Sequence, residues 1–220
     1  MNKLLPCAVV ILWIPFLLVC GGCAFGNREV MLSPVVADNL PPGAAVRTEV
    51  IKVPESEDAR GLSPDFIGYV RNGFGIHTAD VVASKPVRKW VQDILRENLR
   101  AAGYNAVEAN GGGDGLVIAS TIVKLDCDMY MSYKAAVNLS VSLKQNRQVI
   151  FSKSYEGTAS APAFFATPAE YLAVLTTAMR NCVNVMMPEL LEQLNKAKST
   201  AVKPAVPEAV PPSTNKSDPF

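Results

Sequence analysis

Apolar and polar residues alternate along much of the second half of the chain. The alternation is cleanest between residues 135 and 145, where every second position is apolar: Val137, Leu139, Val141 and Leu143. Similar patterns cover residues 116–128 and 148–159, and a weaker one covers 45–53. A period of two residues is typical of strands that bury one face and expose the other to water. The pattern therefore predicts an antiparallel sheet with one solvated face.

Two other segments have apolar residues at steps of three and four, which indicates helices. In the first, Ser84 is expected to cap the N-terminus, Pro86 lies in the first turn, and Gly103 ends the segment. The second begins at Thr167 and Glu170, which have the spacing of a capping box. We therefore expect one helix after residue 84 and another after residue 167.

The predicted elements follow one another in the order β-α-β-β-β-α. Two helices that cover one face of a sheet form a two-layer α+β sandwich, and this is the fold we expect. Residues 54–78 are rich in Pro, Gly and Asp, so we expect a long loop there with short strands at most. The glycine cluster at 110–115 leads into a strand. A phosphate-binding loop would lead into a helix, so we interpret the cluster as a turn.

The N-terminus has the pattern of an export signal. An uncharged apolar run, Leu4 to Val19, follows Lys3 and is short for a membrane-spanning helix. Gly22 and Cys23 come next, and this arrangement resembles the bacterial lipoprotein signal, although Cys20 stands where that signal prefers Leu. The resemblance implies that Cys23 receives a diacylglycerol and that residues 1–22 are removed. An ordinary secretory signal or an uncleaved anchor are the alternatives.

The expected domain organisation follows from these segments and from composition. After a signal peptide at 1–22, the lipidated Cys23 begins a tether at 23–43 that packs partly onto the fold. Residues 44–197 form the α+β domain. Residues 198–220 are rich in Pro, Ser, Thr and Lys, and we expect them to be disordered because they cannot bury enough apolar surface. In enterobacteria, Ala24 after the lipidated Cys favours the outer membrane, facing the periplasm.

Composition excludes some functions and the motifs offer little chemistry. The chain has 21 basic and 20 acidic residues, whereas a nucleic-acid binder needs a basic surplus. Its one histidine, His77, accompanies no recognisable nucleophile motif, so a hydrolase is only a weak third hypothesis. Asp126 and Asp128 flank Cys127, but no second cluster with ligand spacing accompanies them. We therefore expect no catalytic, cofactor-binding or metal site, and we expect both aspartates to point to solvent.

Cys127 and Cys182 are the remaining cysteines once the expected leader and Cys23 are set aside. Both fall on predicted core faces, one on a strand and one on a helix. An oxidising periplasm would allow a disulfide between them. Two separate buried thiols are the alternative, because bridging requires Cα atoms within about 7 Å. The sequence leaves both open.

Together, these segments resemble the YajG-type bacterial lipoproteins. The resemblance rests on the lipoprotein-like signal, on the helix Val87 to Leu99 with the following Arg-Ala-Ala-Gly-Tyr ending at Tyr104, and on the strands at 116–128, 135–145 and 148–159. It covers about residues 80–195. The family has no established catalytic residues, so the resemblance implies none for this chain.

The sequence is most consistent with a non-enzymatic, lipid-anchored envelope module. Its partners would be the membrane, through the anchor, and another protein of the cell envelope, with strand addition at a sheet edge as one route of binding. The alternative is an auxiliary lipoprotein subunit of an envelope lipid or lipopolysaccharide transport system, with an apolar groove between helices and sheet.

Overall fold

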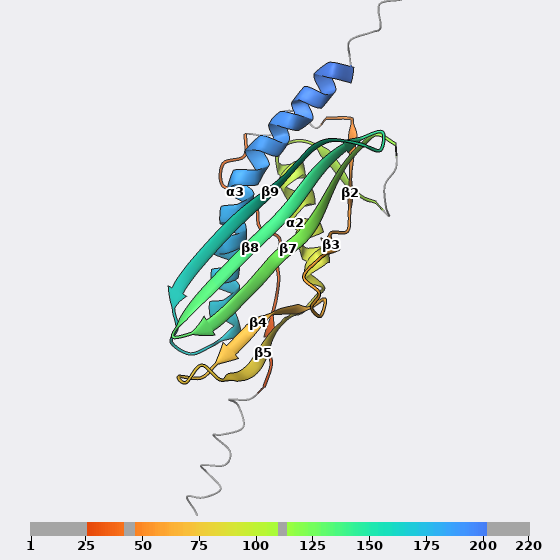
Figure 1. Ribbon diagram of the computed structural model, residues 1–220. Coiled ribbons are helices and arrows are strands. Elements are labelled where there is room, and N and C mark those ends of the chain that lie inside the picture. The colour runs from red at the N-terminus through yellow and green to blue at the C-terminus, as the bar shows by residue number, and fades with distance from the viewer. Residues whose placement is uncertain (1–25, 42–46, 110–113, 202–220) are drawn as a thin grey trace, which may run out of the picture.

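The computed structural model describes residues 26–41, 47–109 and 114–201 (Figure 1). The expected signal peptide, Cys23 and the tail beyond Ala201 lie outside the described residues. Within the described part of the chain, no helix is both long and apolar enough to span a bilayer. The elements are β1 (Arg28–Val30), β2 (Val50–Pro54), β3 (Glu57–Asp58), β4 (Phe66–Arg71), β5 (His77–Ala83), α2 (Val87–Ala101), β6 (Asn105–Ala109), β7 (Leu116–Tyr130), β8 (Ser132–Gln145), β9 (Gln148–Pro162) and α3 (Pro168–Ala201).

Three long antiparallel strands dominate the sheet. β7, β8 and β9 contain 15, 14 and 15 residues and are joined by short turns. Leu139 on β8 pairs with Ile122 on β7 and with Tyr155 on β9, and all three side chains are buried. The alternation in the sequence therefore predicted these strands, and it predicted the buried face of β8 correctly. On β7 the expected face, which ran from Val117 to Leu125 at every second residue, is wrong in part: the register shifts between Ile122 and Lys124, so that Ile122 is buried and Val123 is exposed.

The remaining strands make the sheet mixed. β2, β3 and β4 pair in parallel with β7, β6 pairs in parallel with β2, and β1 pairs in parallel with β5. Between β2 and β6 the chain passes through α2, and a crossover of this kind lets the two strands lie side by side in parallel. The antiparallel sheet expected from the sequence thus describes the three long strands, and the α+β class is confirmed.

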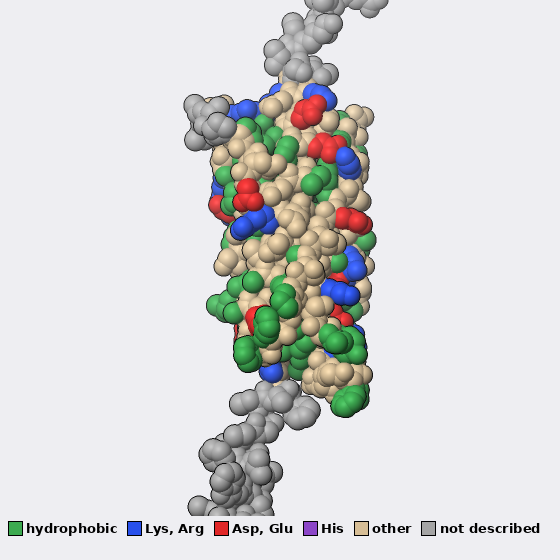
Figure 2. All heavy atoms as spheres, turned by 90° about the vertical axis from the view of Figure 1, so that its left-hand side faces the viewer, with side chains coloured by type: hydrophobic (Ala, Val, Ile, Leu, Met, Phe, Trp, Pro, Cys, Tyr) green, Lys and Arg blue, Asp and Glu red, His purple; other side chains and the backbone are tan. Residues whose placement is uncertain are grey.

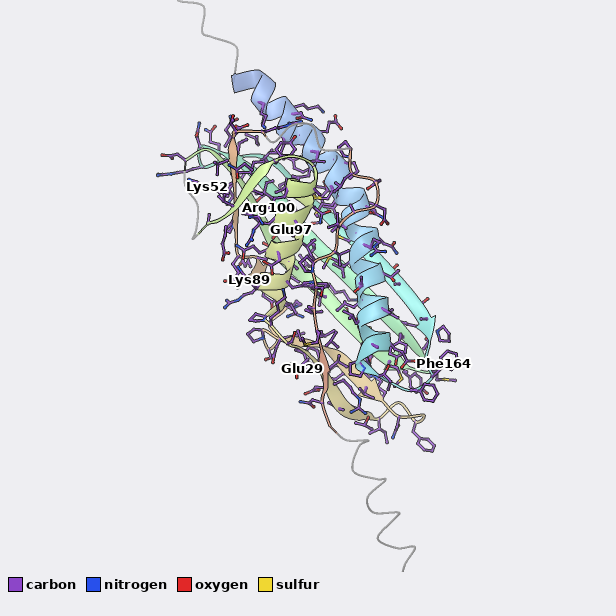
Figure 3. All side chains as sticks on the ribbon, turned by 180° about the vertical axis from the view of Figure 1, so that it is seen from behind. Glu29, Lys52, Lys89, Glu97, Arg100 and Phe164 are labelled. Atoms are coloured by element: carbon purple, nitrogen blue, oxygen red, sulfur yellow. The ribbon has the colours of Figure 1, made fainter. Side chains whose placement is uncertain are left out.

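Both helices lie on the same side of the long strands. Figure 1 looks onto the opposite face with α2 and α3 behind it, and Figure 3 shows the helices in front. Trp90, Ile94 and Leu95 of α2 are fully buried. Leu175 and Met179 of α3 are fully buried in the same core. The two-layer arrangement with both helices on one face is therefore present.

The helix ends confirm some expected signals and correct one. Pro86, not Ser84, is the N-cap of α2, and no side chain caps this end. The Ser84 amide instead donates to the Val30 carbonyl oxygen at 3.0 Å, because β1 lies beside this turn. At the other end, Gly103 has a φ of +83°, as expected for a helix stop.

The start of α3 has the predicted capping box. The Thr167 amide donates to Glu170 Oε2 at 2.9 Å, and the Glu170 amide donates to Thr167 Oγ1 at 3.3 Å. The helix continues past residue 197, and Lys198 forms an ion pair with Glu49 at 2.7 Å. That contact ties the last turns of the helix to the residues before β2.

The segment before β2 packs onto the fold. Val30, Leu32 and Val35 are buried in the core. The Asn98 side chain accepts a hydrogen bond from the Ala37 amide at 2.8 Å and donates to the Val35 carbonyl oxygen at 2.7 Å. Only a few residues therefore separate Cys23 from the packed domain.

Candidate binding surface

The face of the sheet opposite the helices is uncovered by any element in the described part of the chain (Figure 1). Its side chains on β8 and β9 are small and polar along most of the length of the strands. They include Ser132, Asn138, Ser140, Ser142, Ser152, Ser154, Thr158 and Ser160. We call this surface the open face. Small hydroxyl groups keep it wetted and flat, so that a partner can approach the backbone closely.

A hollow of about 710 Å³ lies in the open face, toward the end where β7 joins β8. Ala136 forms its floor because it pairs with Asp126 on one side and with Thr158 on the other, and its own side chain is short. Lys134, opposite Asp128 and Ser160, bounds the next row. A single alanine in a row of longer side chains thus produces a depression.

Two acceptor oxygens in and beside the hollow have no hydrogen-bond donor. Asp126 Oδ1 lines the hollow and Asn138 Oδ1 lies farther along the same face of β8; both atoms are buried and accept no hydrogen bond within the described residues. The nearest cation to Asp126 is Lys124, whose Nζ lies 3.5 Å from Oδ1. Burial is the main cause that raises the pKa of Asp126 above its usual value, and Lys124 opposes this shift. Buried acceptors without donors are uncommon, and here they offer sites for donors from a ligand or partner.

Asp128 differs from Asp126 because it is paired. Arg71 Nε donates to Asp128 Oδ2 at 2.9 Å, and both side chains are about a third exposed. Cys127 between the two aspartates is fully buried on the helix side. The two aspartates therefore lie on the open face and the cysteine on the inner face, as the alternation predicted.

The outer edge of β9 is a second candidate surface. Within the described residues, β9 pairs only with β8. Its middle is closed by α3, where Asn181 Nδ2 donates to the Thr158 carbonyl oxygen at 2.9 Å and Cys182 Sγ lies 3.6 Å from the Tyr155 carbonyl oxygen. At this edge of the sheet, strand addition is therefore restricted to the ends of β9, whereas β1 and β6 form the other edges of the sheet in the described part of the chain.

Cys127 and Cys182, for which the sequence left a disulfide open, have free thiols in the structure. Both side chains are fully buried. Desolvation by burial raises the pKa of each thiol to about 12. Neither cysteine is therefore prepared for nucleophilic or metal chemistry.

The weaker chemical hypotheses find little support among the described residues. His77 lies at the start of β5, half exposed, with Nε2 2.9 Å from Asp80 Oδ1. Its ring contacts the edge of Tyr69. Across residues 26–41, 47–109 and 114–201, no group of three or more His, Cys, Asp or Glu side chains is arranged to hold a metal ion.

The space between α3 and the sheet is filled by side chains. Ala178, Cys182 and Met186 of α3 are fully buried against Val137 and Leu139 of β8, within a single core. The apolar groove that a lipid-carrying subunit would use between these layers is closed at these positions.

The hollow and the exposed apolar loops at one end of the molecule were not predicted from the sequence. Ala136 is the one residue whose small size on a polar face could have indicated the hollow. A single alanine in a strand is common, however, and does not by itself predict a depression. The apolar loops contain Phe74, Met131, Phe164 and Phe165, each more than 70% exposed. Their clustering depends on the pairing of strands that are distant in sequence, which the pattern alone does not give.

The sequence model of the family Lipoprotein_16, described as uncharacterized lipoprotein, matches residues 46–194. The match agrees with the resemblance to YajG-type lipoproteins. The search among curated proteins found no match.

Several solved structures match this chain to different degrees. Protein XCC0632 from Xanthomonas campestris is 14% identical, with a TM-score of 0.59 over 78% of this chain and 99% of that one. PelC from Paraburkholderia phytofirmans, solved as a dodecamer, is 12% identical, with a TM-score of 0.38 over 64% and 92%. Lipoprotein GNA1162 from Neisseria meningitidis is 12% identical, with a TM-score of 0.31 over 67% and 99%. Only the first of these likenesses is close enough to support the fold.

Proposed function

The chain belongs to the Lipoprotein_16 family of uncharacterized lipoproteins, and from that premise we propose that it is a lipid-anchored, non-enzymatic module that binds another protein of the bacterial cell envelope. The anchor is Cys23, and Ala24 favours the periplasmic side of the outer membrane. The hollow of the open face is the observation that carries the binding role. A partner segment with Lys, Arg or amide donors would satisfy Asp126 Oδ1, which has only the Lys124 ammonium at 3.5 Å, and Asn138 Oδ1, which accepts no hydrogen bond within the described residues.

The surroundings of the hollow suit a protein partner better than a small substrate. The hollow is shallow and open, and it continues into the flat row of serines on β8 and β9. Charges of both signs surround it, with Lys124 and Lys134 beside Asp126 and Asp128. Mixed charge of this kind sets orientation and specificity across a protein interface. The titratable thiols and the histidine lie elsewhere.

Site-specific crosslinking tests the binding role. A photo-crosslinking residue placed at Thr158 or Ser160 in cells should yield discrete adducts that mass spectrometry can identify. The matched control is Glu192, which is 61% exposed on α3. If Glu192 gives the same adducts, or if the open face gives none, the proposed surface is wrong.

A second pair of variants separates the hollow from the rest of the open face. Ala136→Leu fills the hollow, and Ser142→Leu adds similar bulk farther along the same face of β8, opposite Ala119 and Ser152. We expect Ala136→Leu to reduce the open-face adducts about tenfold, equivalent to about 1.4 kcal/mol, and Ser142→Leu to change them little. Equal losses would place the partner elsewhere on the face.

The anchor is tested by membrane fractionation. Cys23→Ser should release the protein into the soluble fraction, and Cys20→Ser, in the expected leader, should leave it membrane-bound. Mass spectrometry of the wild-type mature chain should find acyl chains on Cys23. Retention of the Cys23→Ser protein on membranes without acylation would overturn the lipid anchor.

A further inference from the structure

Six exposed hydrophobic side chains of the described chain, among them its four most exposed, lie at one end of the molecule, while the others are spread over the rest of the surface. The four that are most exposed are Phe74 at 89%, Phe165 at 83%, Met131 at 78% and Phe164 at 72%. Ile76 and Tyr130 add exposed apolar surface in the same loops. Scattered single hydrophobic residues are normal on a protein surface, but a cluster of the largest ones marks an interaction site. We call these six residues the apolar tip.

Three loops that are distant in sequence form the apolar tip. The β4–β5 turn supplies Phe74, the β7–β8 turn supplies Met131, and the β9–α3 loop supplies Phe164 and Phe165. A hollow of about 610 Å³ is lined jointly by Met131, Phe164 and Phe165 together with Arg71 and Gly73 of the first turn. The loops are therefore neighbours in space, and Figure 2 shows apolar side chains gathered at this end.

These loops make tight turns above a hydrogen-bonded support. Met131 and Ala166 have φ values of +59° and +53°, which residues other than glycine seldom adopt. Tyr133 donates to Glu170 Oε2 at 3.0 Å, which joins β8 to the start of α3 beneath the loop. The aromatic rings at positions 164 and 165 are thus presented to solvent by an ordered support.

The N-terminal end of the described chain lies at this same tip. Arg28 donates to the Gly26 carbonyl oxygen at 2.6 Å and to the Ala166 carbonyl oxygen at 3.2 Å. This one side chain therefore joins the entry of the chain to the loop that carries Phe164 and Phe165. Figure 3 shows Glu29 and Phe164 at the same end of the molecule, with Lys52 at the other.

The length of the link places the lipid beside the tip. Cys23 precedes Gly26 by three residues. Three residues span at most about 11 Å when fully extended, so an acylated Cys23 cannot be farther than that from Gly26. The surface nearest to the apolar tip in the anchored protein is consequently the bilayer that holds the acyl chains.

We propose that the apolar tip inserts into the interfacial region of the membrane that carries the Cys23 lipid, so that the domain stands end-on and presents its open face to the periplasm. This proposal rests on the lipid anchor of the proposed function. Acyl chains alone hold a protein at the bilayer but leave its orientation free. Aromatic and aliphatic side chains that enter the interface beside the lipid fix that orientation.

Depth measurements on the lipidated full mature chain test this insertion. The chain is reconstituted in vesicles of phosphatidylethanolamine and phosphatidylglycerol, with a spin label at Phe164→Cys or Phe74→Cys. Cys127 and Cys182 are buried and free, so the introduced thiol is the one that reacts. The matched control is a label at Val149→Cys, which is 56% exposed near the β8–β9 turn at the opposite end.

We expect labels at 164 and 74 to be several-fold more accessible to oxygen dissolved in the lipid than to a water-soluble nickel quencher. The label at 149 should show the reverse. Water accessibility at all three positions, in protein shown by mass spectrometry to be acylated, would overturn the insertion while leaving the lipid anchor intact. Absence of acylation would instead overturn the anchor.

A second measurement identifies a protein as the alternative occupant. If the tip labels are exposed to water in protein-free vesicles but are protected in native envelope membranes, the tip docks onto a protein and the proposal is wrong. Without the acyl chains the tip binds too weakly to hold the protein through membrane fractionation, but vesicle binding by the unlipidated Cys23→Ser chain can be titrated at high lipid concentration and gives an independent readout. Phe164→Ser with Phe165→Ser should weaken that binding at least tenfold, and Val149→Ser with Ile150→Ser should not.

Discussion

Gly157 of β9 lies directly against the backbone of α3 at Cys182. A Cβ atom at position 157 would lie 2.5 Å from the Cys182 amide nitrogen and would collide with the Ala178 carbonyl oxygen. The atoms in the way belong mainly to the helix backbone, which cannot rotate aside as a side chain can. Close approach of helix and strand therefore depends on the missing side chain at this position.

Gly157→Ala should destabilise the fold by about 1–3 kcal/mol, because α3 must shift to accommodate the added methyl group. Urea denaturation followed by circular dichroism measures the change in the free energy of unfolding. The control is Gly73→Ala, where a Cβ would meet nothing within 4 Å. A Gly157→Ala protein as stable as the wild type would mean that α3 does not contact β9 this closely.

The two buried thiols should be unreactive in the folded protein. Burial raises the pKa of Cys127 and of Cys182 to about 12, so almost no thiolate is present at neutral pH. In a mature chain carrying Cys23→Ser, a thiol reagent should label neither cysteine under native conditions and both in guanidinium without reductant. Failure to label them after unfolding would indicate a disulfide between Cys127 and Cys182.

Much of the fold could be predicted from local pattern. The alternation from 116 to 159 and the Thr167–Glu170 capping box identify β7, β8, β9 and the start of α3, because each depends on neighbouring residues. β6 and the parallel pairing with β7 were not predicted. They depend on where the crossover through α2 places the chain, which no local spacing specifies.

The candidate surfaces were less predictable than the fold. The hollow needs Ala136 to stand between Asp126 and Thr158, which is a matter of register between three strands. The apolar tip needs three turns to meet, and Phe164 and Phe165 in sequence look like residues that would be buried. Similarly, Ser84 is of a residue type that commonly caps helices, but β1 packs beside it and the Ser84 amide donates to the Val30 carbonyl oxygen of that strand.

The capping carboxylate should make stability depend on acid pH. Hydrogen bonds from Thr167 are the main cause that lowers the pKa of Glu170 below its usual value of 4.5. Because the folded state favours the charged form, the stabilisation is complete above the usual pKa and is lost as the pH falls through the lowered one. Glu170→Gln should therefore be less stable at neutral pH and should lose less stability below about pH 4.5.

Unfolding midpoints measured from neutral to acid pH test this dependence. Glu192→Gln is the matched control, because Glu192 lies on the same helix and is 61% exposed. Its acid profile should follow that of the wild type. Parallel profiles for the wild type and Glu170→Gln would show that the capping carboxylate makes no contribution of this kind.

Asp126 should oppose stability at neutral pH. Desolvation is the main cause that raises its pKa above 3.8, so the folded state favours the protonated form and any stabilisation is lost as the pH rises through the raised pKa. Asp126→Asn should thus stabilise the protein at neutral pH, by less than about 1 kcal/mol because the side chain is 35% exposed and solvent screens it.

If the hollow binds the partner, the Asp126→Asn variant should also lose open-face crosslinks. A residue that binds a partner can be retained although it lowers the stability of the fold. Asp128→Asn is the control: it removes the 2.9 Å pair with Arg71 and should not stabilise the fold. An Asp126→Asn protein that is less stable than the wild type, yet crosslinks normally, would assign Asp126 to the structure of the sheet and exclude it from binding.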